Sequence, residues 1–116
     1  MEDYVTFEQA QRLKELGFDW KCFSYYLYSN EVSLGETPKE YNYIVGNDHI
    51  SAPTLALVQK WLRETKETEV IVIRLDDNVY SYTIYGGIVN VTTERTFDTY
   101  EKALSKGIDR TLELLK

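Results

Sequence analysis

Two residues carry the side chains best suited to nucleophilic chemistry, Cys22 and His49, and each occurs once in the chain. His49 lies beside Asp48 and near Ser51. Adjacent residues seldom reach one another in the geometry of a triad, because its members must converge in space, and this segment is typical of a turn before a helix. Cys22 follows Lys21, which would lower the pKa of an exposed thiol, whereas cysteine is more often a small buried residue. We therefore expect no catalytic residue and no enzyme.

Metal and phosphate binding are disfavoured by the residues available. Zinc sites take three or four protein ligands, and Cys22 and His49 are the only soft ligands in the chain. Asp76-Asp77-Asn78 offers oxygen atoms, but its spacing is not that of an EF-hand loop, and a polar hairpin tip is the better interpretation. Gly86-Gly87 opens a strand rather than a helix, unlike a nucleotide-binding loop. We expect no metal and no cofactor.

Tyrosine is the most informative residue type, because ten are present and eight fall in three predicted strands, residues 23–28, 41–45 and 79–85. A tyrosine packs through its ring while its hydroxyl remains free for water or a partner, and tyrosine is enriched at protein interfaces. We therefore predict a partner-binding sheet face with some rings partly exposed. The candidate residues are Tyr26, Tyr28, Tyr80 and Tyr82. The alternative is that these rings cover the sheet and bind nothing.

Composition and charge limit the partners and the setting. The chain has 116 residues, 43% of them hydrophobic, which suits a single domain over residues 1–116 with its own core. Its net charge of −6 disfavours nucleic acid and anionic membranes as partners. The single cysteine fits a reducing compartment, and neither a signal peptide nor a membrane-spanning apolar run is evident. We expect a cytoplasmic protein with a protein partner, of which the simplest is a second copy in a homodimer.

The N-terminal half is predicted to contain a well-defined helix followed by strands. Thr6 and Gln9 have the spacing of a capping box, and Gly17 supplies the stop after a helical apolar stripe. A strand follows over residues 23–28, then a loop over residues 29–40, a short strand over residues 41–45 and a second helix that starts near residues 51–53. The 29–40 loop is a second candidate binding element, because loops often carry binding residues.

The C-terminal half is predicted to be a set of antiparallel strands followed by a helix. Residues 70–75 form a nearly continuous β-branched run, which predicts a central strand covered on both faces. A hairpin at Asp76-Asp77-Asn78 leads to the strand over residues 79–85 and then to an edge strand over residues 88–93. The last helix is capped by Asp98 or Thr99. Gly107 lies in its apolar stripe, where it predicts close approach of a neighbouring backbone.

This order of elements predicts an α+β fold with an antiparallel sheet of about four to five strands and three helices, packed mostly on one face.

Three segments also resemble known proteins. They are residues 7–18, Ala52-Pro53-Thr54 running into Lys60-Trp61-Leu62-Arg63-Glu64, and Phe97-Asp98-Thr99-Tyr100-Glu101-Lys102-Ala103-Leu104. Together they resemble a family of short uncharacterised proteins from gut Bacteroidales and their phage or mobile elements. The resemblance implies a mobile-element context and no activity. The final hairpin and helix also resemble HicB-like antitoxins.

We therefore hypothesise a small non-enzymatic protein-binding or adaptor module that uses the tyrosine-rich sheet face or the 29–40 loop. The alternative is a nucleic-acid-associated or antitoxin-like regulator that acts through a local patch or a protein partner. An enzyme built on carboxylates and tyrosines is a third hypothesis.

Overall fold

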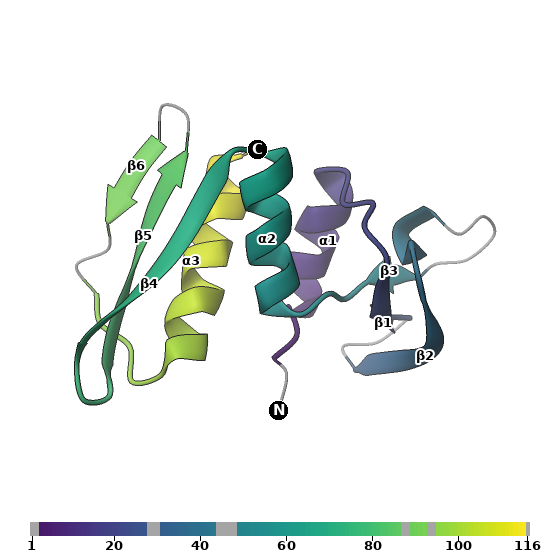
Figure 1. The fold of residues 1–116 in the computed structure, drawn as a ribbon. Coiled ribbons are helices and arrows are strands. Elements are labelled where there is room, and N and C mark those ends of the chain that lie inside the picture. Colours follow the sequence, from purple (N-terminus) through teal and green to yellow (C-terminus); the bar gives the residue numbers. More distant parts are fainter. Residues whose placement is uncertain (1–2, 28–30, 44–48, 87–88, 93–94, 116) are drawn as a thin grey trace. The chain divides into compact units, whose positions relative to one another are not determined.

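The computed structural model describes residues 3–27, 31–43, 49–86, 89–92 and 95–115, and the chain divides into two compact units. The first unit ends at Thr54, and the second spans Leu55–Leu115. Along the chain the elements are α1 (Phe7–Glu15), β1 (Cys22–Tyr26), β2 (Val32–Lys39), the 3-10 helix η1 (Tyr41–Tyr43), β3 (Ile50–Ser51), α2 (Leu55–Thr65), β4 (Thr68–Asp76), β5 (Val79–Gly86), β6 (Val89–Thr92) and α3 (Tyr100–Leu114) (Figure 1).

The predicted α+β class, with three helices and antiparallel strands, is confirmed among the described residues. The strands form two three-stranded sheets where one sheet of four to five strands was expected, with orders β2-β1-β3 and β4-β5-β6. The sheets are separate because β1 and β3 pair with each other across intervening elements, whereas β4, β5 and β6 pair with their neighbours in sequence. The expectation of a single domain stays a prediction.

The first helix has the ends that its sequence predicts. The Gln9 backbone N–H donates to the Thr6 hydroxyl at 3.1 Å, and the Thr6 N–H donates to the Gln9 side chain at 2.9 Å, which completes the capping box. At the other end Gly17 has a φ of 88°, which a glycine adopts without strain. The Phe18 N–H then donates to the Leu13 carbonyl at 2.9 Å, which is the closing bond of a Schellman motif.

The 29–40 loop predicted from the sequence is wrong for most of its length, because β2 occupies Val32–Lys39. Residues 29 and 30 lie outside the described part. β2 pairs with β1, and the register jumps: Ser24 faces Leu34 while Cys22 faces Lys39. The intervening residues of β2 have no facing partner, so the glycine and proline that indicated a loop are accommodated in an irregular strand. A Cβ on Gly35 would collide with the Tyr41 hydroxyl, which explains the glycine there.

The strand predicted over residues 41–45 is also wrong where it is described, because Tyr41–Tyr43 is the 3-10 helix η1; residues 44 and 45 lie outside the described part. Side-chain bonds replace a strand ladder at this point. The Asn42 side chain accepts from the Ser51 N–H at 2.8 Å and donates to the Phe18 carbonyl at 3.0 Å. Because β3 occupies Ile50–Ser51, α2 begins at Leu55 rather than near residues 51–53.

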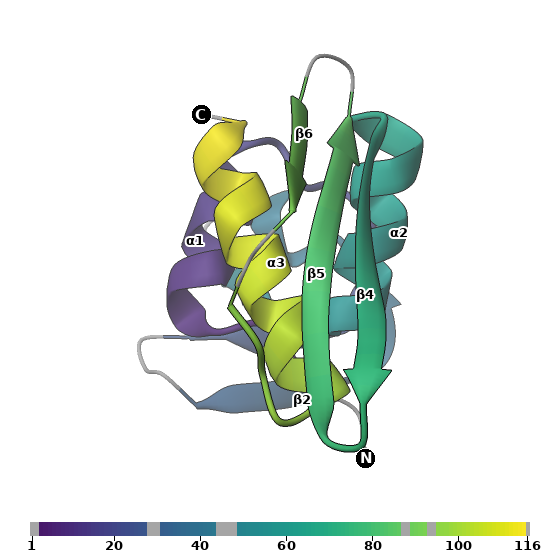
Figure 2. The same ribbon diagram turned by 90° about the vertical axis from the view of Figure 1, so that its left-hand side faces the viewer.

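The second unit is one sheet with helices on one of its faces. Figure 2 shows β4, β5 and β6 in front, with α2 and α3 behind them. The predicted hairpin joins β4 to β5, and Asn78 in its turn has a φ of 56°, a left-handed conformation that asparagine tolerates. The predicted strand after Gly86-Gly87 is confirmed as β6, which pairs with β5 at the edge of the sheet.

The last helix packs on this sheet through its glycine. Thr99 caps α3 by accepting from the Lys102 N–H at 3.1 Å. A Cβ on Gly107 would lie 2.8 Å from Val70 Cγ1 and 3.1 Å from Tyr82 Cγ, closer than ordinary van der Waals contact. Gly107 is therefore a close packing contact, but its neighbours are side chains of β4 and β5 rather than the backbone that was expected.

No helix among the described residues combines the length and the apolar character needed to cross a membrane.

Candidate functional site

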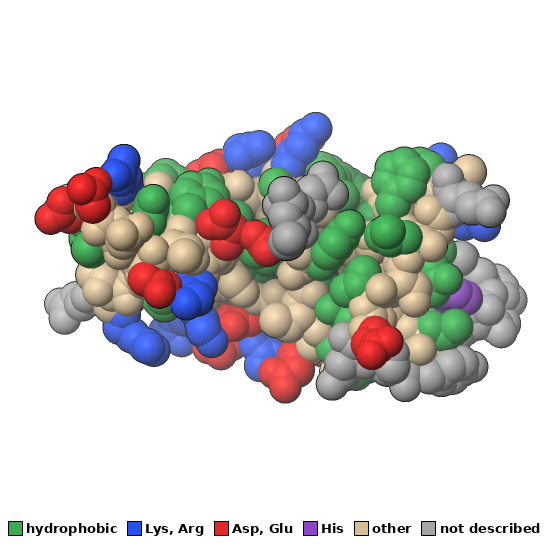
Figure 3. Space-filling view, turned by 90° about the horizontal axis from the view of Figure 1, so that it is seen from below, with side chains coloured by type: hydrophobic (Ala, Val, Ile, Leu, Met, Phe, Trp, Pro, Cys, Tyr) green, Lys and Arg blue, Asp and Glu red, His purple; other side chains and the backbone are tan. Residues whose placement is uncertain are grey.

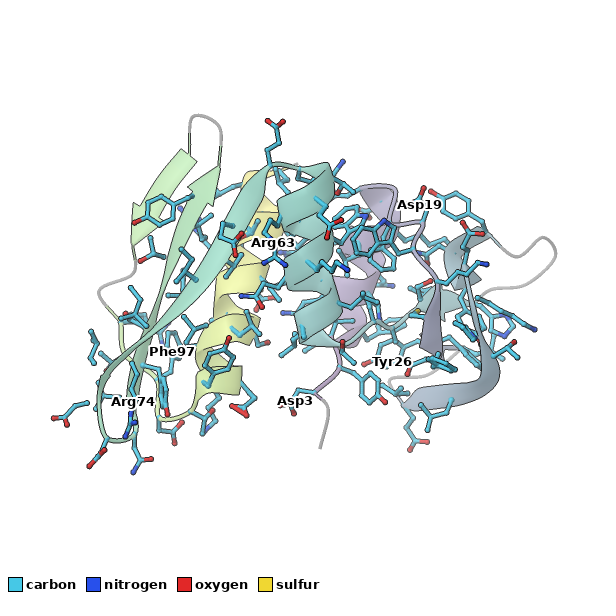
Figure 4. All side chains as sticks on the ribbon, viewed as in Figure 1. Asp3, Asp19, Tyr26, Arg63, Arg74 and Phe97 are labelled. Atoms are coloured by element: carbon cyan, nitrogen blue, oxygen red, sulfur yellow. The ribbon has the colours of Figure 1, made fainter. Side chains whose placement is uncertain are left out.

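Of the four tyrosines that are candidates for partner binding, two are buried. Tyr26 is buried in the first unit, where its hydroxyl donates to the Val5 carbonyl at 2.7 Å (Figure 4). Tyr82 is buried in the second unit against Gly107. Tyr80 is half-buried, and Tyr28 lies outside the described part. Two of the four rings are therefore buried in the cores of different units. A tyrosine can be buried on the inward face of a strand when its hydroxyl finds a hydrogen-bond partner or reaches the edge of the core.

The two candidate nucleophilic residues of the sequence lie in the first unit, in a cluster of rings. His49 contacts Tyr25, with ring centres 4.6 Å apart, and stacks on Tyr41 at 5.8 Å. Cys22 is buried, and its thiol donates to the Ser24 carbonyl at 3.3 Å. Burial raises the pKa of the Cys22 thiol, so the thiol stays protonated, which disfavours attack by sulfur. Burial therefore disfavours Cys22 as the nucleophile of this cluster.

The hydroxyls of Tyr26 and Tyr41 are poor acids for the same reason. Burial raises the pKa of Tyr26, and burial together with the nearby Tyr25 raises the pKa of Tyr41. The described residues also contain no group of three or more His, Cys, Asp or Glu side chains that could hold a metal ion.

The face of the second sheet opposite its helices carries exposed apolar side chains. Val70 and Tyr82 contact α3, so they and the residues in step with them point toward the helices. The alternate residues of β4, Ile71 and Ile73, point to the other face, where their facing partners on β5 are Thr83 and Ser81. Tyr85 of β5 alternates with Ile84 and therefore lies on this same face, opposite Glu69 of β4.

We call this surface the open-face stripe. It consists of Ile71, Ile73 and Tyr85, together with Leu75 beside the bulge at the end of β4. These side chains are 36%, 40%, 49% and 58% exposed, respectively. They belong to two adjacent strands, β4 and β5, and Figure 2 shows no helix in front of these strands. An apolar group of this kind on a sheet marks a site of interaction more often than scattered single residues do.

The prediction that β4 is a central strand covered on both faces is wrong. β4 lies at the edge of its sheet, with β5 as its one neighbour among the described strands. Its residues in step with Val70 pack toward α2 and α3, and the other set is exposed. The error has a physical cause: when both faces of a strand are apolar, the sequence shows no alternation from which the covered face could be identified.

Charged pairs lie near both ends of β4, although Arg74 alternates with Ile73 and so belongs to the other face of the strand. Near the start of β4, Arg63 of α2 and Glu69 are 3.1 Å apart. Near the hairpin, Arg74 binds Asp77, and Figure 4 labels both arginines. These pairs are exposed and contribute little to stability.

The first unit exposes apolar side chains as well, but they are dispersed over several elements. Phe23 lies on β1, Leu34 on β2 and Tyr43 on η1, and all are exposed. Figure 3 shows hydrophobic side chains in several separate groups over this part of the chain, and charged side chains of both signs over the β4–β5 hairpin. Leu34 and Pro38 are the exposed apolar residues of the 29–40 segment in its described part, so that candidate binding element presents less apolar surface than β4.

Ile71 and Ile73 were not expected at the surface, because residues 70–75 were predicted to be covered on both faces. A usable signal was present in the order of the elements. With β4 joined to β5 by a tight turn, and α2 and α3 the helices nearest in sequence, the sheet has too few helices to cover both of its faces.

Comparison with known proteins finds no matching family model, no matching curated protein and no matching solved structure.

Proposed function

We propose that this chain is a non-enzymatic protein-binding module whose contact surface is the open-face stripe. The observation that carries the proposal is the exposure of Ile71, Ile73, Leu75 and Tyr85 side by side on one sheet. Burying apolar surface contributes roughly 25 cal/mol per Å², so a partner that covers these side chains gains free energy that isolated exposed residues cannot supply.

The rest of the surface supports a protein partner over a polyanion. The chain carries a net charge of −6, and the cations near the two ends of β4, Arg63 and Arg74, are each paired with an acid. Nucleic-acid affinity depends on unpaired cations that can release counterions from phosphates. Arg63 and Arg74 are not cations of this kind, because each is paired with an acid.

A matched pair of variants tests this proposal. Ile73→Thr keeps a β-branched residue on the strand but removes apolar surface from the stripe, and Leu34→Thr makes the same kind of change on the exposed part of β2. We expect each tagged protein to fold, with thermal unfolding close to that of the wild type, since both sites are exposed. Captured from cells of the native host, the Ile73→Thr protein should lose the bound partner, and the Leu34→Thr protein should keep it.

The opposite result overturns the proposal. A partner that stays bound to Ile73→Thr at the wild-type level, measured by quantitative mass spectrometry of the captured material, shows that the stripe is not the contact surface.

A further inference from the structure

We infer that the partner that covers the open-face stripe is a second copy of this chain, joined to the first through the outer edge of β4. This inference rests on the proposed function and names its partner. A second feature of β4 supports it: among the described strands, none pairs with the outer edge of β4.

The backbone N–H and C=O groups of Arg74 point away from β5. Tyr80 faces Arg74 in the sheet, and Tyr80 exchanges both of its backbone hydrogen bonds with Phe97, at 2.8 Å in each direction. Tyr80 therefore turns its N–H and C=O away from β4, so the facing pair is of the type that shares no hydrogen bonds. In such a pair the second residue also directs its groups outward, which places those of Arg74 on the free edge.

The same alternation places Val70 and Val72 on the free edge with Arg74. The Val70 carbonyl already has a hydrogen bond, because the Gln59 side chain of α2 donates to it at 2.6 Å. Beyond Arg74 the register of β4 shifts at a bulge before Asp76. Among the described residues the edge is therefore open over a short stretch, whose outward backbone groups belong to Val72 and Arg74. Bulges and covering groups commonly protect the edge strands of native sheets. The open stretch of β4 lies between the Gln59 bond on one side and the bulge before Asp76 on the other.

A second copy fits this stretch about a twofold axis at Ile73. In that register Val72 of one chain faces Arg74 of the other, so their outward N–H and C=O groups bond in both directions. The bond from Gln59 to Val70 remains intact. Because the axis is perpendicular to the sheet, both copies present the same face, and the two stripes merge. Ile73 then contacts Ile73 of the second copy, and Ile71 lies near its Leu75.

The charges of the edge permit this approach. Arg74 is the cation closest to the axis, and it is bound to Asp77 of its own chain. Glu69 is likewise bound to Arg63. Pairing two copies therefore brings no unpaired like charges together at the axis. The interface is short, so we expect a weak, reversible dimer of the kind formed by small interfaces.

Disulfide trapping tests the register. Facing residues that share no hydrogen bonds have Cα atoms about 4.5 Å apart, within the range a disulfide spans. Purified Ile73→Cys should therefore form a covalent dimer in a glutathione redox buffer. Ile71→Cys, on the same face but away from the axis, should form at least about tenfold less, because its two copies lie beyond disulfide reach. The wild type, with its buried Cys22, should form none.

The outcomes separate this inference from the proposed function. Equal trapping of Ile71→Cys and Ile73→Cys overturns the twofold register. If the wild type sediments as a strict monomer at roughly several hundred micromolar, the inference that the partner is a second copy is wrong, since weak homodimers form at such concentrations. If the monomer result stands while Ile73→Thr still loses a partner of different mass in the capture experiment, the proposed function survives without this inference. If Ile73→Thr loses nothing, the proposed function fails independently of trapping.

Discussion

Replacing Gly107 with leucine is expected to lower the free energy of unfolding by about 1–3 kcal/mol, because overpacking forces neighbouring side chains out of their rotamers. The site has no room: a single added carbon would lie 2.8 Å from Val70 and 3.1 Å from Tyr82. Leucine favours a helix over glycine by roughly 1 kcal/mol, so packing must outweigh propensity for this result to appear. Chemical denaturation followed by circular dichroism measures the change.

Lys106→Leu is the matched control, because Lys106 is the preceding residue of α3 and is exposed. It should change stability by no more than about 0.5 kcal/mol, as surface substitutions usually do. A Gly107→Leu protein at least as stable as the wild type would show that α3 does not approach the sheet as closely as described.

Replacing Asn42 with alanine is expected to lower the free energy of unfolding by about 2–4 kcal/mol, because each buried group left without a hydrogen bond costs about 1–3 kcal/mol. One side chain holds three segments of the first unit together. It accepts from the Ser51 N–H of β3 and donates to the Phe18 carbonyl after α1, while its own backbone lies in η1. Ser51 and Phe18 are both buried, so water cannot readily replace the lost bonds.

Asn42→Asp separates the two bonds, since a carboxylate still accepts from Ser51 but cannot donate to Phe18. Its stability should fall between those of Asn42→Ala and the wild type, as measured by thermal unfolding. Gln11→Ala, which removes an exposed amide from α1, should have little effect. An Asn42→Ala protein that unfolds with the wild type would mean that this residue does not fasten η1.

Local signals determined what could be predicted from the sequence. The ends of α1 and the start of α3 depend on residues within a few positions of one another, such as Thr6 with Gln9 and Thr99 with Lys102. The ends of α1 are as predicted, and Thr99 is one of the two caps predicted for α3. The position of Gly107 was also readable, because a glycine in an apolar helical stripe needs a packing reason.

Pairing between distant segments could not be read in the same way. β2 is a strand because β1 supplies a hydrogen-bonding partner, despite the turn-forming residues in its own sequence. η1 is not a strand because Asn42 bonds to residues far along the chain. Local propensity is a weak guide where tertiary contacts decide the conformation.

The candidate site was the least predictable part. Some of the strand tyrosines were expected to be partly exposed, and Tyr43 and Tyr85 are exposed, but the candidate binding residues Tyr26 and Tyr82 are buried. The exposed residues Ile71 and Ile73 have the composition of a core strand. Their exposure follows from the edge position of β4 in the sheet, which depends on strand order and is not encoded in the run itself.

Photo-crosslinking in living cells tests the proposed contact surface most directly. A photoreactive phenylalanine analogue is placed at Ile73 in one version of the chain and at Leu34 in another, so that both probes start from exposed apolar positions. We expect a discrete crosslinked adduct from position 73 after irradiation in the native host, and little or none from position 34. An adduct from position 34 with none from position 73 would contradict this expectation, and so would the absence of any adduct from position 73.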